Sequence, residues 1–164
     1  MRDAARPAAD RGSGLPAARA LLLLPALFAF AVQSPSLSHD FAGDDPQVIL
    51  ANPQITGGAS LLDLVRSDWF DSGGTSAIGY YRPVTKASFR ITWALAGPSA
   101  FAFHLGSLAA HASAVLLLTL LLARLFDLRV ALLGGALWGV HPMTVQAVQN
   151  VTARSDVLAG AFLL

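Results

Sequence analysis

The longest uninterrupted apolar stretch of the chain lies in its second half. Between Ile91 and Ala123 the sequence contains no Asp, Glu, Lys or Arg. A helix needs about 20 consecutive apolar residues to cross the roughly 30 Å hydrocarbon layer of a bilayer. The densest part of the stretch, Phe101 to Leu122, therefore predicts a transmembrane helix over residues 101–123.

Three further apolar segments accompany this one. Residues 15–32 follow several arginines and are predicted to be a first transmembrane helix or, alternatively, a signal peptide, because Ala29-Phe30-Ala31 resembles a small-residue cleavage site. Residues 130–140 form a third predicted helix, which stops at His141-Pro142 because a proline disfavours helical backbone in the residue before it. Residues 145–164 form a fourth, and we expect it to be truncated in a fragment of a longer protein.

The charges between these segments predict their orientation. Residues 1–14 and the short connection at 124–129 carry arginine, which by the positive-inside rule places both on the cytoplasmic side. Residues 33–100 then form a long exported loop, and residues 141–144 form a short exported turn. The expected fold is all-α, a polytopic helical membrane protein with a cytoplasmic N-terminus.

The exported loop has an amphipathic segment of its own. Between Ser60 and Phe70 the apolar residues fall largely on one side of a helix, which predicts a short helix at the membrane surface with interfacial aromatic residues. Ser60 is expected to cap this helix, with Asp63 three residues later, where an acid suits a helix N-terminus. Residues 71–76 have the composition of a flexible loop. Tyr80-Tyr81-Arg82-Pro83 then form either an aromatic belt with a cationic anchor or part of a site.

Composition agrees with a membrane protein and excludes several functions. The chain is 54% hydrophobic and 13% charged, whereas soluble proteins average about 25% charged residues. A formal net charge of +1 without a basic run excludes a nucleic-acid partner. The absence of cysteine excludes disulfides and thiolate chemistry. All acidic residues are Asp and all basic ones but a single lysine are Arg. We attribute this bias to a GC-rich bacterial genome. The predicted location of the protein is therefore a bacterial inner membrane.

The fourth segment carries polar residues that are unusual in a membrane helix. Gln146, Asn150 and Arg154 are spaced four apart, and Gln149 and Asp156 fall on a neighbouring face. Such a face has to turn toward protein or a water-filled cavity. Arg154 and Asp156 are too close in sequence for a helical ion pair, so each is expected to have another partner. A structural network between helices is the alternative to a site.

The adjacent carboxylates Asp44 and Asp45 are the best indication of chemistry. A charge beside hydrocarbon is costly unless it meets water, a counter-ion or a substrate, which makes the pair a candidate site. The two residues can equally be solvated turn residues before Pro46, since Asp favours turns. The pattern by itself leaves both interpretations open.

Several short motifs together resemble a known family. They are Asp44-Asp45, Asn52-Pro53, Tyr80-Tyr81-Arg82-Pro83, His104, His111, His141-Pro142, Ala147-Val148 and Arg154-x-Asp156-x-Leu158. In order and spacing they resemble the N-terminal membrane region of the transmembrane and tetratricopeptide-repeat O-mannosyltransferase-like proteins, within the C-type glycosyltransferase superfamily. The resemblance extends from about Ser38 to the last residue. Such proteins usually carry Glu where this chain has Gln146, and if that acid were needed the protein would be impaired.

The resemblance implies a membrane glycosyltransferase. Its donor would be a sugar, mannose by analogy, linked to polyprenyl phosphate, and its acceptor a protein or glycan on the exported face. Asp44 or Asp45 would be the general base that takes the acceptor proton. Arg82 and Arg154 would hold the donor phosphate, for which Arg is suited. Further residues expected to line the site are Tyr81, His141, Gln146 and Asp156.

Metal use and two other functions remain open at this point. No arrangement of His and Asp compels a metal, although a divalent cation is compatible with the chemistry. A non-catalytic membrane scaffold, with partner-binding tetratricopeptide repeats in a missing C-terminal region, is the main alternative. A transporter that uses Arg154 and Asp156 ranks last, because the sequence shows neither an internal repeat nor a pair of broken helices.

Overall fold

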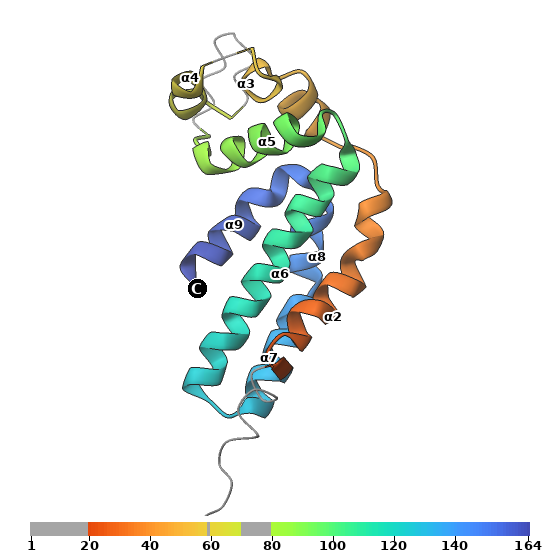
Figure 1. Cartoon of the computed structure of the whole chain (residues 1–164), viewed down its shortest axis with the longest axis vertical. Coiled ribbons are helices and arrows are strands. Elements are labelled where there is room, and N and C mark those ends of the chain that lie inside the picture. The colour runs from red at the N-terminus through yellow and green to blue at the C-terminus, as the bar shows by residue number, and fades with distance from the viewer. Residues whose placement is uncertain (1–19, 59, 70–79) are drawn as a thin grey trace, which may run out of the picture.

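The computed structural model describes residues 20–58, 60–69 and 80–164, and the regular structure within these ranges is helical (Figure 1). The all-α prediction is confirmed for this part of the chain. The predicted tail at 1–14, the first residues of the segment at 15–32 and the loop at 71–76 lie outside the described residues.

Helix α6, Ala100–Leu125, is the central element of a helical bundle. Within the described part of the chain it is the one helix that is long and apolar enough to cross a membrane. The side chain of Ser99 caps its N-terminus by accepting a hydrogen bond from the backbone N–H of Ala102. The helix predicted at 101–123 is thus present, with slightly wider bounds.

Helices α2, Leu24–Gln33, and α7, Leu128–Gly139, both pack along α6 (Figure 1). Small residues allow the close approach of the three helices. A Cβ atom built on Gly139 would lie 2.8 Å from that of Ala29 and 3.2 Å from Cγ2 of Val115. The backbone of α7 therefore rests directly on its two neighbours.

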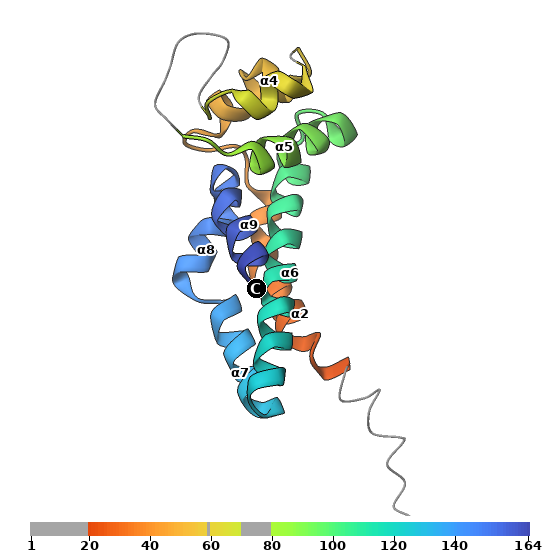
Figure 2. The same ribbon diagram turned by 90° about the vertical axis from the view of Figure 1, so that its left-hand side faces the viewer.

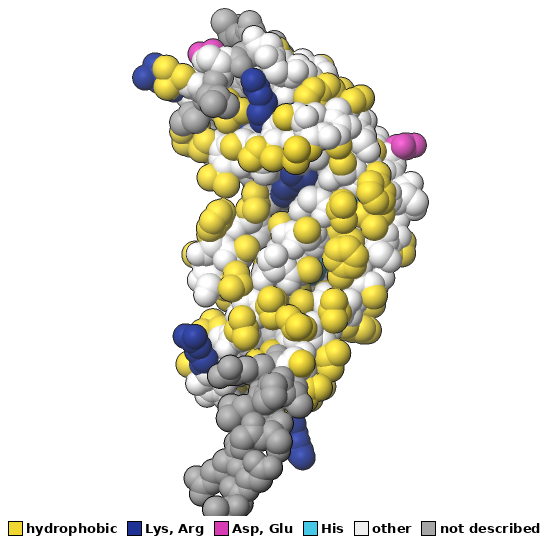
Figure 3. All heavy atoms as spheres, in the orientation of Figure 1, with side chains coloured by type: hydrophobic (Ala, Val, Ile, Leu, Met, Phe, Trp, Pro, Cys, Tyr) yellow, Lys and Arg dark blue, Asp and Glu magenta, His cyan; other side chains and the backbone are white. Residues whose placement is uncertain are grey.

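The outer surface of this bundle is apolar. Leu27 on α2 is 61% exposed, and Leu133 and Leu137 on α7 are 64% and 69% exposed. Figure 3 shows hydrophobic side chains spread over the visible side of the bundle. An exposed apolar surface of this size is typical of contact with a membrane or with other protein.

The predicted fourth helix is broken, which corrects the prediction of a continuous helix at 145–164. The segment forms α8, Pro142–Gln149, a single 3₁₀ turn, Val151–Ala153, and α9, Arg154–Leu163. The break falls at Asn150, whose side-chain oxygen accepts hydrogen bonds from the backbone N–H and the hydroxyl of Thr152. Asn competes with helix continuation through such local bonds. The polar residues before and after the break therefore do not share one helix face.

The turn η1, Ser34–Ser38, follows α2 and packs along α6. A helical cap, described over residues 46–58, 60–69 and 80–96, then covers one end of the bundle (Figure 2). It corresponds to most of the predicted exported loop and contains η2, Pro46–Leu50, α3, Pro53–Thr56, α4, Leu61–Arg66, and α5, Pro83–Ala96. Its core is built around Ile49, Ile55 and Phe89, which have no exposed surface. The ring of Phe89 lies 5.7 Å from that of Phe103 on α6, so cap and bundle share one hydrophobic core.

Helix α4 begins with the predicted cap. The hydroxyl of Ser60 accepts a hydrogen bond from the backbone N–H of Asp63, whose carboxylate accepts bonds from the backbone N–H and hydroxyl of Ser60. The helix ends at Arg66, so it is shorter than the predicted segment at 60–70. Trp69, expected among interfacial aromatics, is only 3% exposed and packs against Phe89.

Helix α5 is an element that the sequence analysis did not predict. Pro83 occupies its first turn, where the missing N–H of proline costs nothing. The helix ends at Gly97, whose φ of +60° suits glycine, and Pro98 follows. The charge-free stretch that begins at Ile91 is therefore divided between α5 and α6.

Candidate active site

The two adjacent carboxylates lie in a turn between α2 and the cap, and they face different surroundings. Gly43, with φ +58°, turns the chain just before them. Asp45 is 1% exposed, and its oxygens accept hydrogen bonds from the backbone N–H groups of Ala42, at 3.2 Å, and Thr152, at 3.0 Å. Asp44 is exposed and lines a cavity. The pair therefore divides into a buried, hydrogen-bonded member and an accessible one.

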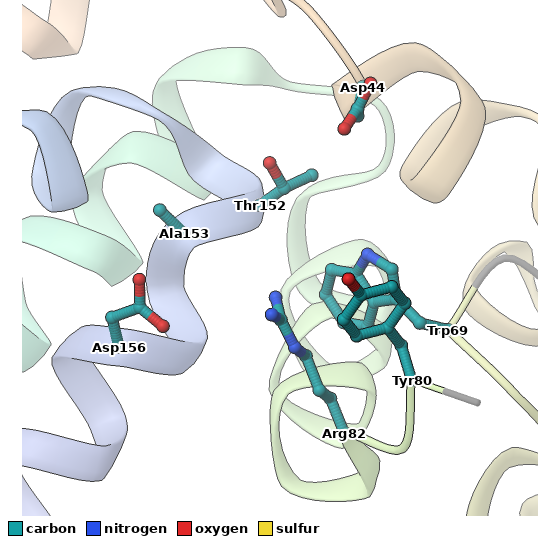
Figure 4. A pocket seen from close by; sticks show the side chains of 7 residues that line it. All are labelled: Asp44, Trp69, Tyr80, Arg82, Thr152, Ala153 and Asp156. Carbon is teal, nitrogen blue, oxygen red and sulfur yellow. The ribbon is translucent and has the colours of Figure 1, made fainter. Parts of the chain in front are cut away.

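The cavity beside Asp44 has a volume of about 290 Å³ and lies between the cap and the start of α9 (Figure 4). Its lining residues come from four separate segments of the chain: Asp44, Trp69, Tyr80, Arg82, Thr152, Ala153 and Asp156. They include carboxylates, a guanidinium and aromatic rings. We call it the Asp44 cavity.

Arg82 supplies the positive charge of the Asp44 cavity. It precedes Pro83 at the start of α5, and its guanidinium lies 5.1 Å from the ring centre of Trp69 and 5.7 Å from that of Tyr80. The backbone N–H of Trp69 donates a 2.7 Å hydrogen bond to the carbonyl of Tyr80. The two aromatic residues are thus tied together and hold the guanidinium by cation–π contact.

The opposite wall of the cavity is formed where the fourth segment breaks. Thr152 and Ala153 lie in the 3₁₀ turn, and Asp156 projects from the first turn of α9. In Figure 4 Arg82 reaches into the cavity from the side of α5, and Asp156 lies on the side of α9. A continuous helix would carry these residues differently, so the break shapes the cavity.

Arg154, predicted to hold the donor phosphate, does not line the Asp44 cavity. It is 2% exposed, and its guanidinium lies 4.6 Å from the ring centre of Phe89. It donates hydrogen bonds to three hydroxyls and one carbonyl: Ser107 Oγ, Ser88 Oγ, Thr92 Oγ1 and the carbonyl of Phe103. The sequence predicted that Arg154 has a partner outside its own helix, and these acceptors are such partners.

Three other predicted residues lie outside the Asp44 cavity. Tyr81 is 61% exposed. His141 is exposed at the start of α8, where its Nδ1 atom accepts a hydrogen bond from the backbone N–H of Met143. Gln146 lines a second cavity of about 390 Å³, which also includes Gly43. Gln146, where the resemblance leads us to expect an acid, therefore lies outside the Asp44 cavity.

The two histidines of the resemblance lie inside the bundle. His111 is buried on α6, with its Nε2 atom 2.9 Å from the carbonyl of Gly139. His104 is 1% exposed, and its ring meets that of His39 edge-on at 6.0 Å. Within residues 20–58, 60–69 and 80–164, no group of three His, Cys, Asp or Glu side chains is placed to hold a metal ion.

Sequence reasoning missed the contribution of Trp69 to the site. Lys86, fully buried on α5, donates hydrogen bonds to the carbonyls of Ser67, at 3.3 Å, and Asp68, at 2.8 Å, and thereby fixes the segment that leads to Trp69. One signal was available, since Lys86 is the single lysine in a chain whose other cations are arginine. A lysine can meet several carbonyls at once with its three donors.

The helices and the Asp44 cavity together define the class of protein. The described part of the chain is all-helical and contains one helix of membrane length, and its cavity combines exposed carboxylates with an arginine held against aromatic rings. Such a cavity can accept a proton and bind a negatively charged group side by side.

Known proteins similar to this chain are protein O-mannosyl-transferases. It is 33% identical to Tmtc1 of Drosophila melanogaster over 135 residues, which make up 79% of this chain and 15% of that protein. It is 32% identical to F38B6.6 of Caenorhabditis elegans over 78% of this chain and 19% of that protein. It is 31% identical to human TMTC1 over 93% of this chain and 18% of that protein. No protein-family model matches the chain, and no solved structure matches it.

The chain thus spans less than a fifth of the length of these curated relatives. The similarity covers most of the chain and supports a resemblance to protein O-mannosyl-transferases.

Proposed function

We propose that this chain forms the N-terminal membrane region of an O-mannosyltransferase-like glycosyltransferase and that the Asp44 cavity is its reaction site. The observation that carries the proposal is the presence of Asp44 and Arg82 in one cavity. The similarity of the chain to proteins named O-mannosyl-transferases supports it.

Asp44 is the general base of the proposed reaction. It takes the proton of an acceptor hydroxyl while that oxygen attacks the anomeric carbon of the donor sugar. A new carbon–oxygen bond forms as the bond between the anomeric carbon and the phosphate oxygen breaks, and the electron pair leaves with the phosphate. Because the hydroxyl attacks from the face opposite the leaving group, the configuration of the sugar inverts.

Arg82 binds the donor phosphate and stabilises the charge that grows on it. A guanidinium can make two parallel hydrogen bonds to phosphate oxygens. Trp69 and Tyr80 hold it in place and so reduce the ordering that donor binding requires. Asp156, at the opposite wall, accepts hydrogen bonds from sugar hydroxyls.

Asp45 is less suited to act as the base. Both of its oxygens accept backbone hydrogen bonds, and its carboxylate is 1% exposed. A general base has to come within hydrogen-bond reach of the acceptor hydroxyl, and burial keeps that hydroxyl away from Asp45. We therefore assign the base to Asp44 and a structural part to Asp45.

The donor of the proposed reaction is a sugar linked to polyprenyl phosphate, and the acceptor is a protein or glycan on the exported face. The apolar surface of the bundle and the length of α6 support a position in a lipid bilayer. In this proposal the bilayer is a bacterial inner membrane and the N-terminus lies in the cytoplasm. The cap and the Asp44 cavity then lie on the exported side. The resemblance to the C-type glycosyltransferase superfamily implies the same side for its acidic motif.

The test is sugar transfer by the full-length protein in proteoliposomes that contain a radiolabelled polyprenyl-phosphate mannose. The Asp44→Asn variant is expected to lose about 10²- to 10⁴-fold in kcat, the usual contribution of a general base. Asp40→Asn is the matched control, because Asp40 is an exposed carboxylate in the same connecting segment and does not line the cavity. Unchanged transfer by Asp44→Asn would remove the mechanism, and no donor binding by the wild type would favour the non-catalytic scaffold.

A further inference from the structure

Arg154 is a buried cation whose recorded hydrogen-bond acceptors are all neutral. The Nε atom donates to Ser107 Oγ at 3.1 Å, and Nη1 donates to Ser88 Oγ at 3.2 Å. Further bonds reach Thr92 Oγ1, at 3.4 Å, and the carbonyl of Phe103. All three guanidinium nitrogens are therefore engaged within the protein.

These acceptors tie three helices together at one point. Ser88 and Thr92 belong to α5, which carries Arg82 at its start, whereas Ser107 belongs to α6. Arg154 itself is the first residue of α9. Its side chain thus fixes the start of α9 against both the cap and the bundle.

The shape of α6 leaves room for the guanidinium. A Cβ atom built on Gly106 would lie 2.9 Å from Nη2 of Arg154, 3.2 Å from Cζ and 3.3 Å from Nη1. A side chain at Gly106 would therefore push the guanidinium out of its place. The rings of Phe89 and Phe103, 4.6 and 5.7 Å away, border it further.

A second anchor holds the backbone just before α9. The buried carboxylate of Asp45 accepts the backbone N–H of Thr152, two residues before Arg154. Asp156, which lines the Asp44 cavity, comes two residues after it. The two anchors therefore hold residues 152 and 154, which lie within the stretch of backbone that forms one wall of the cavity.

We propose that Arg154 is a positioning residue: its contacts with α5 and α6 hold the start of α9 so that Thr152 and Asp156 face Asp44 and Arg82 across the cavity. This inference rests on the proposed function of the cavity. It assigns donor phosphate binding to Arg82 alone and gives Arg154 no contact with substrate.

The experiment compares Gly106→Ala with Gly160→Ala in the full-length protein. Gly106→Ala displaces the guanidinium without altering any residue of the cavity lining, and the atoms it meets are the far end of a flexible side chain. Gly160→Ala makes the same change on α9 itself, where a Cβ atom meets nothing within 4 Å. Thermal unfolding in detergent is measured first, to establish that both variants are folded.

The first readout does not depend on activity. A cysteine introduced by Ala153→Cys, after replacement of any cysteine elsewhere in the full-length protein, is labelled with a maleimide, because Ala153 lies in the cavity wall. We expect Gly106→Ala to change the labelling rate about tenfold and Gly160→Ala to leave it unchanged. A tenfold change requires a difference of only about 1.4 kcal/mol in the activation free energy of labelling. Equal labelling rates in both folded variants would overturn the proposal.

The second readout separates positioning from phosphate binding. Gly106→Ala and Arg154→Lys are expected to lower kcat about 10- to 100-fold, as misplacement of a cavity wall does, with unchanged affinity for polyprenyl-phosphate mannose. A loss of donor affinity in Arg154→Lys, with normal labelling of Ala153→Cys, would show that Arg154 binds phosphate and would overturn the proposal. If the wild type binds no donor, the proposed function fails, while the labelling result still tests the placement of α9.

Discussion

The carboxylate of Asp45 accepts a 3.0 Å hydrogen bond from the backbone N–H of Thr152, 107 positions further along the chain. This bond joins the turn after α2 to the break between α8 and α9. It lies directly beside the accessible carboxylate of Asp44, so a structural contact and a candidate chemical group occupy adjacent residues.

We expect Asp45→Asn to lower the free energy of unfolding and Asp44→Asn to leave it nearly unchanged. In Asp45→Asn an amide group replaces one acceptor oxygen, so one hydrogen bond to a charged carboxylate is lost, which costs about 1.5–3 kcal/mol of unfolding free energy. Asp44→Asn changes an exposed group and should leave the unfolding free energy within about 0.5 kcal/mol of the wild type. Chemical denaturation of the two variants measures this difference. Equal stability of both would contradict the division of roles.

The Arg82→Lys variant should bind the donor less tightly. Lysine keeps the charge but loses the planar group that lies against Trp69 and Tyr80 and can hold phosphate with two parallel bonds. We expect the donor Kd to rise about tenfold, equivalent to roughly 1.4 kcal/mol, measured by equilibrium binding of polyprenyl-phosphate mannose. Arg66→Lys is the control, since Arg66 is exposed at the end of α4. Identical donor affinity in both variants would exclude Arg82 as the phosphate ligand.

The capping box of α4 should make the start of this helix sensitive to acid. The side chain and backbone N–H of Ser60 hold the pKa of Asp63 below its ordinary value of 3.8 by hydrogen bonding to the carboxylate. The stabilisation is therefore fully present above the ordinary pKa and is lost as the pH falls through the lowered pKa of the folded protein. Amide exchange of residues 61–66 should accelerate over that interval.

Asp63→Asn serves as the control for this pH effect. It removes the titrating group, so its amide exchange in α4 should show no additional step in the same acidic interval. A step of equal size in Asp63→Asn would assign the effect to another carboxylate.

Gly139→Ala should destabilise the packing of α7 on α2 and α6. The added Cβ would lie 2.8 Å from that of Ala29, and the carbonyl of Gly139 accepts a hydrogen bond from Gln33 Nε2 at 2.8 Å. Overpacking of this kind costs about 1–3 kcal/mol. Gly160→Ala, whose added Cβ meets nothing within 4 Å, is expected to be at least as stable as the wild type, because alanine favours helix over glycine. Unfolding in detergent measures both, and equal midpoints would contradict the close packing at Gly139.

Local signals in the sequence predicted several helix boundaries well. The charge-free stretch indicated α6, His141-Pro142 marked the boundary between α7 and α8, and Ser60 with Asp63 indicated the cap of α4. Each of these depends on neighbours a few positions apart, which the chain itself displays.

The broken fourth segment was predicted wrongly because its cause is not confined to neighbouring residues. Spacing placed Gln146 and Arg154 on one face, as a continuous helix would. In the structure the turn at Thr152 is held by Asn150 and, from the other end of the chain, by Asp45. Only the second of these contacts connects distant segments, and no periodic pattern reveals it.

The sequence by itself determined the all-helical class, the apolar helix α6 and the type of groups available for chemistry, because composition and periodicity are properties of the chain alone. The tertiary structure decided which groups meet. It buried Asp45 and Arg154 and left Asp44 and Arg82 to line one cavity with Trp69. The reason is physical: burial and the choice of hydrogen-bond partners depend on contacts between segments many residues apart. These contacts form only when the cap and the bundle pack together.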